Sequence, residues 1–230
     1  MSKVLVTGFG PYGVTPVNPA QLTAEELDGR TIAGATVISR IVPNTFFESI
    51  AAAQQAIAEI EPALVIMLGE YPGRSMITVE RLAQNVNDCG RYGLADCAGR
   101  VLVGEPTDPA GPVAYHATVP VRAMVLAMRK AGVPADVSDA AGTFVCNHLS
   151  TACCTTSPRR VCPSAPVGFI CRACPASPHW ITTSVFRACR SRRRSPGSRL
   201  ASRQPFGSPQ ISANRSRRDC RSRAQLTAVF

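Results

Sequence analysis

The segment KVLVTGFGPYG, residues 3–13 of the 230-residue chain, indicates the fold class. Its first five residues form a short apolar stretch typical of a buried strand, and the glycines and proline after it form a loop. Open α/β sheets present binding loops in this way, at the carboxyl ends of their strands. Asn18-Pro19 then predicts a helix that runs to Leu27, because asparagine caps a helix and proline suits its first turn.

Further strands and helices alternate along the chain. Apolar stretches predict strands at 31–42 and 63–68, and three-and-four spacing predicts helices at 45–59 and 121–131. Residues 75–85 could form a strand or a short helix, and residues 86–112 form a long irregular segment of a kind that often carries function. We therefore expect a three-layer αβα sandwich with a mostly parallel central sheet. The glycine loop is too irregular for a dinucleotide-binding fingerprint.

A second segment, AGTFVCNHL at residues 141–149, carries a cysteine where a helix could begin. A thiol at a helix N-terminus faces unpaired backbone N–H groups and the positive end of the helix dipole, which favour the thiolate. Cys146 is therefore a candidate nucleophile. The alternative is a buried structural cysteine, the commoner role for a cysteine beside Phe144 and Val145.

Charge divides the chain into two parts. Residues 1–149 contain 10 of the 25 Lys and Arg residues and 14 of the 15 acidic residues, a net charge of −4. Residues 150–230 contain 15 arginines and the remaining acid, Asp219, a net charge of +14. The basic pI therefore belongs to the second part. We expect residues 1–149 to form the N-terminal two-thirds of an α/β domain, and residues 150–230 to be an aberrant or disordered tail.

The chain carries no signal for secretion or membrane insertion. Its first residues lack the long apolar region of a signal peptide, and no apolar run approaches the ~18 residues of a membrane span. Of the ten cysteines only Cys89, Cys97 and Cys146 fall in residues 1–149, which suits a reducing compartment. We therefore expect a cytoplasmic protein without membrane partners.

Four segments, in this order, are similar to one known family. They are KVLVTGFGPYG with Asn18-Pro19, LGEYPGR at residues 68–74, TVERLAQN at residues 78–85, and GTFVCN at residues 142–147. Over residues 1–149 the chain resembles pyroglutamyl peptidase I, or pyrrolidone-carboxylate peptidase, a family of cysteine peptidases. The resemblance implies removal of N-terminal pyroglutamate from peptides through an acyl-enzyme, without metal, nucleotide or other cofactor. It is compatible with a homo-oligomer where the fold is complete.

The resemblance also assigns catalytic roles. Cys146 would be the nucleophile, and Glu80 the acid that orients the catalytic histidine and stabilises its charged form. Arg91 stands in the place of a family arginine near the oxyanion, although the residues around it depart from the family pattern. Without the resemblance, Glu80 would be a solvated carboxylate beside Arg81.

A second group of residues would bind the substrate ring. By resemblance Phe9 and Tyr12 form the aromatic pair of a pocket for a small neutral lactam, whereas from the sequence alone both could simply pack within their loop. Asn18 is a further substrate-binding candidate, or a residue that only hydrogen-bonds locally and caps its helix. Glu70 stands where the family commonly has glutamine, which would alter lactam recognition only if its side chain points inward.

The tail beyond Leu149 has three interpretations. It contains 15 Arg, 13 Ser, 8 Pro and 7 Cys but only two Leu, too few large aliphatic residues to offset the entropy of folding. It could be a basic arm that contacts nucleic-acid phosphates, which makes a non-enzymatic binding protein the alternative function. It could hold zinc through Cys171 and Cys174, although no second pair has suitable spacing. It could also be an out-of-frame translation of the last third of the domain.

Codon analysis supports a frame change. Residues 151–158 can be encoded ACG GCG TGC TGC ACC ACC TCG CCC, which one base earlier reads Tyr-Gly-Val-Leu-His-His-Leu-Ala. With the same offset, residues 167–172 can read Gly-Trp-Ile-His-Leu-Pro, and by resemblance the family carries its catalytic histidine in such a block. Because two segments recover the family with one offset, we expect an out-of-frame tail and no nucleic-acid partner.

The family histidine is then missing from this chain. The shifted frame places it across residues 169–170, where neither side chain accepts a proton. His148 would point away from the thiol on a helix, His116 is expected to pack or cap, and His179 lies among the prolines of the tail. General-base assistance is worth about 10²–10⁴-fold in rate, so we predict little or no activity for this chain.

Overall fold

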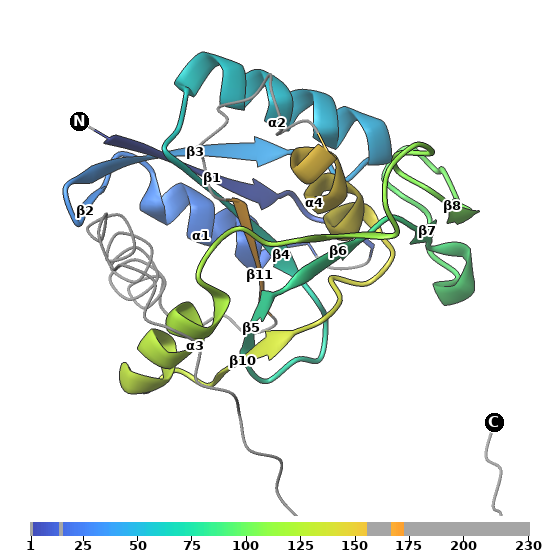
Figure 1. Cartoon of the computed structure of the whole chain (residues 1–230). Coiled ribbons are helices and arrows are strands. Elements are labelled where there is room, and N and C mark those ends of the chain that lie inside the picture. Colours follow the sequence, from blue (N-terminus) through green and yellow to red (C-terminus); the bar gives the residue numbers. More distant parts are fainter. Residues whose placement is uncertain (1, 14–15, 156–166, 173–230) are drawn as a thin grey trace, which may run out of the picture. The chain divides into compact units, whose positions relative to one another are not determined.

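The computed structural model describes residues 2–13, 16–155 and 167–172 (Figure 1). The elements in chain order are β1 (Ser2–Phe9), α1 (Pro19–Leu27), β2 (Thr31–Ile32), β3 (Ala35–Val42), α2 (Phe46–Ile60), β4 (Leu64–Glu70), β5 (Ile77–Glu80), β6 (Leu82–Gln84), β7 (Asn87–Asp88), the 3-10 helix η1 (Gly90–Tyr92), β8 (Val103–Glu105), β9 (Ala114–His116), α3 (Val121–Lys130), β10 (Ala135–Ser138), α4 (Val145–Thr155) and β11 (Val167–Arg172).

A seven-stranded sheet forms the centre, in the order β10-β5-β11-β4-β1-β3-β2. Strands β3, β1, β4 and β11 run parallel to one another, and β5 runs parallel to β10. The antiparallel pairs are β11 with β5 and β2 with β3. The prediction of a mostly parallel α/β sheet is therefore confirmed.

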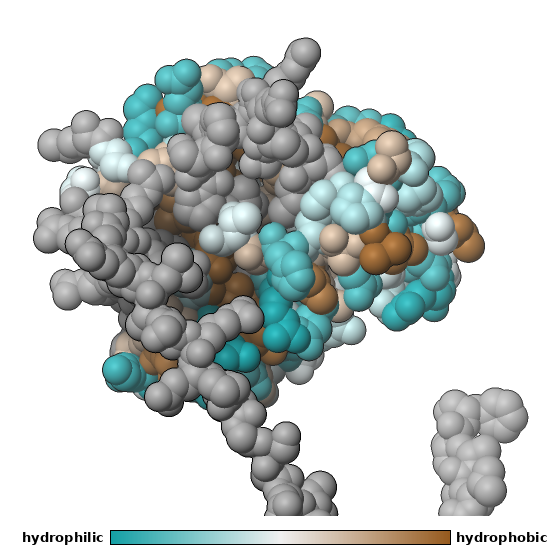
Figure 2. All heavy atoms as spheres, in the orientation of Figure 1, coloured by the Kyte–Doolittle hydropathy of each residue, from teal (hydrophilic) through white to brown (hydrophobic). Residues whose placement is uncertain are grey.

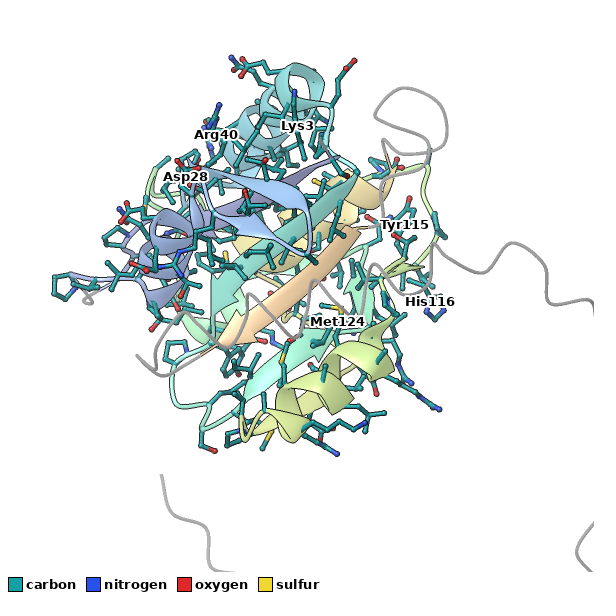
Figure 3. All side chains as sticks on the ribbon, turned by 90° about the vertical axis from the view of Figure 1, so that its left-hand side faces the viewer. Lys3, Asp28, Arg40, Tyr115, His116 and Met124 are labelled. Carbon is teal, nitrogen blue, oxygen red and sulfur yellow. The ribbon has the colours of Figure 1, made fainter. Side chains whose placement is uncertain are left out.

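Two apolar layers cover this sheet, one on each face. Alternate residues of the central strands point to opposite faces, so that Val6 and Ile66 pack with α1 and α3, whereas Leu5 and Met67 pack with α2 and α4. Figure 1 shows the two helix pairs on either side of the sheet. Figure 3 shows Met124 pointing from α3 toward the sheet, where it is fully buried. The predicted three-layer sandwich is confirmed.

Two predicted elements are divided in the structure. The strand expected over residues 31–42 is a hairpin of β2 and β3, because Ala33 and Gly34 adopt left-handed conformations with φ of 52° and 76° and reverse the chain. Residues 75–85, predicted as a strand or a short helix, form the two short strands β5 and β6. Strand β6 leaves the main sheet and pairs with β9.

The long segment 86–112 is held to the domain by a buried aspartate. One carboxylate oxygen of Asp96 accepts a hydrogen bond of 3.0 Å from the backbone N–H of Phe46, at the start of α2. The other accepts from the backbone N–H groups of Ala98 and Arg100 at 2.9 and 2.8 Å. Arg100 also binds the Glu48 carboxylate with its two terminal guanidinium nitrogens. These contacts place the segment over the N-terminus of α2.

Apolar side chains also reach the surface of this segment. Val101 and Val103 are half-exposed or more. Figure 2 shows apolar surface on the side of the molecule where Figure 1 places β7 and β8. Within the described ranges, no helix is both long and apolar enough to span a bilayer.

Part of the predicted tail belongs to the domain. Residues 150–155 complete α4, and residues 167–172 form β11 between β4 and β5. The backbone of β11 can join the sheet because strand pairing is made by main-chain groups. The arginine clusters of the proposed nucleic-acid arm, Cys174 of the proposed zinc module, and His179 lie outside the described residues.

Candidate active site

The turn before α4 positions Cys146. Gly142 has a φ of 80°, a left-handed conformation that favours glycine. The next residue, Thr143, is tied to Asp88 by two hydrogen bonds of 2.9 Å, one from its hydroxyl to the Asp88 carbonyl and one from the Asp88 backbone N–H to its own carbonyl. Helix α4 begins at Val145, so Cys146 lies in its first turn, as predicted.

Asn147 fixes the helix beside this turn to strand β6. Its side-chain oxygen accepts from the backbone N–H of Gln84 at 2.8 Å, and its side-chain nitrogen donates to the carbonyls of Gln84 and Val86 at 2.7 and 3.0 Å. Asn147 is fully buried. The three bonds hold the first turn of α4, and with it the neighbouring thiol, against the strand that follows Glu80.

The thiol of Cys146 is less acidic than its helix position led us to expect. Burial raises its pKa to about 12, and the negative charges of Glu80 and Glu70 act in the same direction. The backbone N–H groups of Glu70 and of Cys146 itself lower the pKa, but they do not offset the burial and the carboxylates. The helix N-terminus alone therefore does not produce a thiolate at neutral pH.

Glu80 is a buried carboxylate whose negative charge acts on this thiol. It ends β5 and is 2% exposed. Its Oε1 accepts from Thr78 Oγ1 at 2.9 Å and from Arg74 Nη1 at 3.2 Å, whereas Oε2 is enclosed and has no partner among the described residues. Burial raises the pKa of Glu80, and the nearby hydroxyls of Ser138 and Thr78 together with the charge of Arg74 oppose the shift. The alternative of a solvated carboxylate beside Arg81 does not hold, since Glu80 is buried and Arg81 pairs with Asp139.

Glu70 brings a second carboxylate to the thiol. It ends β4, is partly buried, and its Oε2 is enclosed without a partner among the described residues. Burial raises the pKa of Glu70. Because its backbone N–H and its charge both act on Cys146, Glu70 is part of the surroundings of the thiol.

The two predicted ring-binding residues differ in exposure. Phe9 is 1% exposed and belongs to the core between the sheet and α2. Tyr12 is partly exposed, and its ring centroid lies 6.3 Å from that of Phe144 in a tilted arrangement. Phe144 in turn contacts Phe46 edge-on at 5.6 Å. The aromatic pair beside the cysteine turn is therefore Tyr12 with Phe144, while Phe9 supports the loop from the core.

Asn18 acts on the same loop. Its side-chain oxygen accepts from the backbone N–H of Ala20 at 2.9 Å and caps α1, while its side-chain nitrogen donates to the Gly10 carbonyl at 2.9 Å. Asn44 donates to the same carbonyl and to that of Pro11. Asn18 is 1% exposed, and both ends of its amide are used within the protein. It therefore positions the loop from Gly10 to Tyr12.

Arg91 lies on η1, shortly after the residue that anchors Thr143. It is exposed, and its guanidinium stacks over the Tyr92 ring at 4.6 Å and donates to the Tyr92 hydroxyl at 2.8 Å. These contacts give Arg91 a local partner. Its role toward an oxyanion stays a prediction.

The described histidines lie away from the thiol. His148 is buried, its Nδ1 is 2.9 Å from Thr107 Oγ1, and its ring contacts Phe46 and Phe47 edge-on. Burial lowers its pKa to about 4. His116 on β9 is exposed and projects from the body of the protein in Figure 3, so the expectation that it packs or caps is wrong.

Sequence reasoning missed three residues that shape this site. Arg74, Asn147 and Phe144 lie within the segments that carry the family resemblance, but no pattern in the sequence shows that they contact Glu80, β6 and Tyr12. Their partners are distant in sequence or depend on a turn. Among the described residues, the arrangement supplies a thiol, an oriented acid and an aromatic pair, and it supplies no imidazole between thiol and acid.

Comparison with known proteins identifies relatives that share this sequence and fold. The family model described as pyroglutamyl peptidase matches residues 2–184. The chain is 85% identical over 149 residues to a pyrrolidone-carboxylate peptidase of Mycobacterium marinum, an alignment that covers 65% of this chain and 67% of the relative. A relative from Streptomyces coelicolor with the same name is 46% identical over 150 residues, 65% of this chain and 68% of the relative.

Solved structures agree with the sequence relatives. The crystal structure of pyroglutamyl peptidase I from Bacillus amyloliquefaciens has a TM-score of 0.76 and 35% identity, and the match covers 83% of this chain and 94% of that one. Since the family model spans more than half of the chain and agrees with both the fold and the cysteine turn, the chain belongs to the pyroglutamyl peptidase family of cysteine peptidases.

Proposed function

We propose that residues 1–149 form the greater part of a cysteine exopeptidase that releases N-terminal pyroglutamate from peptides. The observation that carries this proposal is that Cys146, in the first turn of α4, lies within the electrostatic influence of the buried Glu80, whose Oε2 has no partner among the described residues. A buried acceptor of this kind costs free energy unless a donor completes it. An imidazole between acid and thiol would supply that donor, as in other catalytic triads.

The proposed reaction passes through three steps at Cys146: attack by the sulfur, loss of the amine, and hydrolysis of the thioester. The deprotonated sulfur attacks the carbonyl carbon of the pyroglutamyl residue and forms a tetrahedral oxyanion. Collapse of this intermediate breaks the peptide C–N bond, and the base returns the sulfur's proton to the leaving amine. Water then cleaves the thioester, which releases pyroglutamate and restores the thiol. Tyr12 and Phe144 supply apolar walls for the lactam ring.

The described part of the chain lacks the base for these steps. Both described histidines are engaged or exposed elsewhere, and burial together with two carboxylates raises the pKa of Cys146 to about 12. A neighbouring imidazolium would lower that pKa by stabilising the thiolate. We therefore propose that a frame change after Leu149 removed the histidine and that this chain has little or no activity.

Strand β11 is compatible with a frame change. Its backbone at residues 169–171 pairs with residues 67–69 of β4 and with residues 78–80 of β5, so it runs beside Glu80. In the other frame this segment can read Gly-Trp-Ile-His-Leu-Pro, in which Trp and Ile suit a strand. The same frame would bring a histidine into the strand next to Glu80.

The test is hydrolysis of a pyroglutamyl chromogenic amide by three purified proteins of confirmed mass. They are the chain itself, a version with the alternative frame restored after Leu149, and the restored version with Cys146→Ala. We expect turnover only in the restored protein. Clear turnover by the chain itself would contradict the missing base, and an inactive but folded restored protein would contradict the peptidase assignment.

A further inference from the structure

Glu70 places an uncompensated carboxylate beside the nucleophile. Its backbone N–H interacts with the Cys146 thiol, and its side chain is partly buried with Oε2 enclosed. Within the described residues, Glu70 takes part in none of the ion pairs, and Oε2 has no hydrogen-bond partner. Neither a described ion pair nor a described hydrogen bond to Oε2 therefore accounts for the position of this carboxylate.

The nearby charged side chains that the structure describes do not neutralise it. Glu80 is a second carboxylate that acts on the thiol, and Arg74 is already bound to Glu80 and Thr78, with its guanidinium stacked 4.6 Å over the Tyr71 ring. On β11, Arg172 takes the register position next to Glu70. One described cation therefore faces two carboxylates around Cys146.

We propose that Glu70 is a specificity-determining residue whose carboxylate excludes anionic groups from the Cys146 thiol. This inference rests on the proposed peptidase function, because it assigns the site pyroglutamyl peptides in which a neutral or basic residue follows the pyroglutamate. A peptide with Asp or Glu in that position would bring a second negative charge to a partly desolvated carboxylate. Charges in such surroundings interact several-fold more strongly than in bulk water.

The test compares two thiol reagents of similar size, neutral iodoacetamide and anionic iodoacetate, on the full chain. Site-resolved mass spectrometry gives the alkylation rate of Cys146 with each reagent. Both reagents attack the thiolate, so its fraction cancels in the ratio of the two rates. We expect Glu70→Gln to raise the iodoacetate-to-iodoacetamide ratio at Cys146 by roughly three- to tenfold at low salt, and by less at high salt.

Two controls separate charge at the site from other effects. Glu61→Gln removes the same charge from the other end of β4, about 20 Å away along the strand, and should leave the ratio at Cys146 unchanged. The exposed Cys97, whose thiol lies 3.9 Å from the Pro11 carbonyl of the first loop, is an internal reference in every sample, and its ratio should respond less than that of Cys146 to Glu70→Gln. An unchanged ratio at Cys146 would overturn the proposal, and it is also the result expected if Arg172 neutralises Glu70. An equal change in the ratio at Cys97 would overturn it as well.

Alkylation needs no turnover, so this result is independent of the peptidase assay. A shifted ratio in a protein whose restored frame is inactive would retain the charge effect and reject the peptidase function. In an active restored protein, Glu70→Gln should raise the rate for pyroglutamyl-Glu-amide relative to pyroglutamyl-Gln-amide by a similar factor. If that relative rate does not change, Glu70 does not determine specificity.

Discussion

Arg74 binds one oxygen of Glu80 and leaves the other without a partner among the described residues. The Arg74 Nη1 to Glu80 Oε1 distance is 3.2 Å, and the side chain of Glu80 is 2% exposed while that of Arg74 is 25% exposed. This ion pair supports the ionised form of Glu80 against burial, which raises its pKa. Arg74, which lies outside the cysteine motif, therefore helps to keep the acid of the candidate site ionised.

Loss of Arg74 should destabilise the protein. Arg74→Met leaves Glu80 buried without its cation, and we expect the free energy of unfolding to fall by about 2–3 kcal/mol at pH 7. The matched control is Arg81→Met, which breaks the half-exposed pair with Asp139 and should cost about 0–1 kcal/mol. Denaturant unfolding measures both. Equal losses in the two variants would show that the buried pair has no special weight.

Substitutions of Gly8, in β1, and of Gly10, in the loop after it, should differ sharply in their effect on stability. A Cβ on Gly8 would lie 2.5 Å from the Ala20 carbonyl oxygen of α1, and backbone cannot easily move away. On Gly10 the nearest atom would be Gln21 Oε1 at 3.8 Å. We expect Gly8→Ala to lower the free energy of unfolding by about 2–3 kcal/mol and Gly10→Ala to change it by less than about 0.5 kcal/mol. A tolerated Gly8→Ala would contradict the close packing of β1 on α1.

His148 should make stability depend on pH. Burial lowers its pKa to about 4 from an ordinary value of 6.5, so the folded state holds it neutral. Its contribution to stability is complete above pH 6.5 and is lost as the pH falls toward 4, because the unfolded chain binds the proton first. The loss is on the order of 3 kcal/mol. Urea unfolding of the chain and of His148→Gln between pH 4 and 7 measures it.

The exposed His116 provides the control for that series. His116→Gln should retain the pH dependence of the unmodified chain, whereas His148→Gln should lose the part that lies between pH 6.5 and 4. A pH dependence that survives in His148→Gln would assign it to the carboxylates.

The Cys146 thiol should react slowly at neutral pH. Its pKa of about 12 predicts an alkylation rate with iodoacetamide that still rises about tenfold per pH unit between pH 8 and 10. Glu80→Gln removes a charge that raises this pKa and should increase the rate at pH 8. Site-resolved mass spectrometry separates Cys146 from Cys97. A plateau for Cys146 by pH 8 would show that a cation stabilises the thiolate.

Much of the fold could be predicted from local sequence. The strand at β1, the helix from Asn18-Pro19 to Leu27 and the continuous apolar strand β4 follow from periodicity and from capping. The hairpin of β2 and β3 was missed, because the turn at Ala33-Gly34 interrupts a run that is otherwise rich in β-branched residues. The order of the strands also depends on pairings between distant segments.

For the candidate site, the sequence by itself determined which chemistry is present. Local patterns place Cys146 after a small-residue turn and an aromatic loop after the first strand, and the family resemblance singles out Glu80 in a segment that could have been a strand or a short helix. Only the tertiary structure decided how these groups behave. Burial and the carboxylates raise the pKa of Cys146, Arg74 holds Glu80, and Asn44 holds the loop at Gly10. Burial and electrostatic fields are sums over neighbours from distant parts of the chain, so no local pattern contains them.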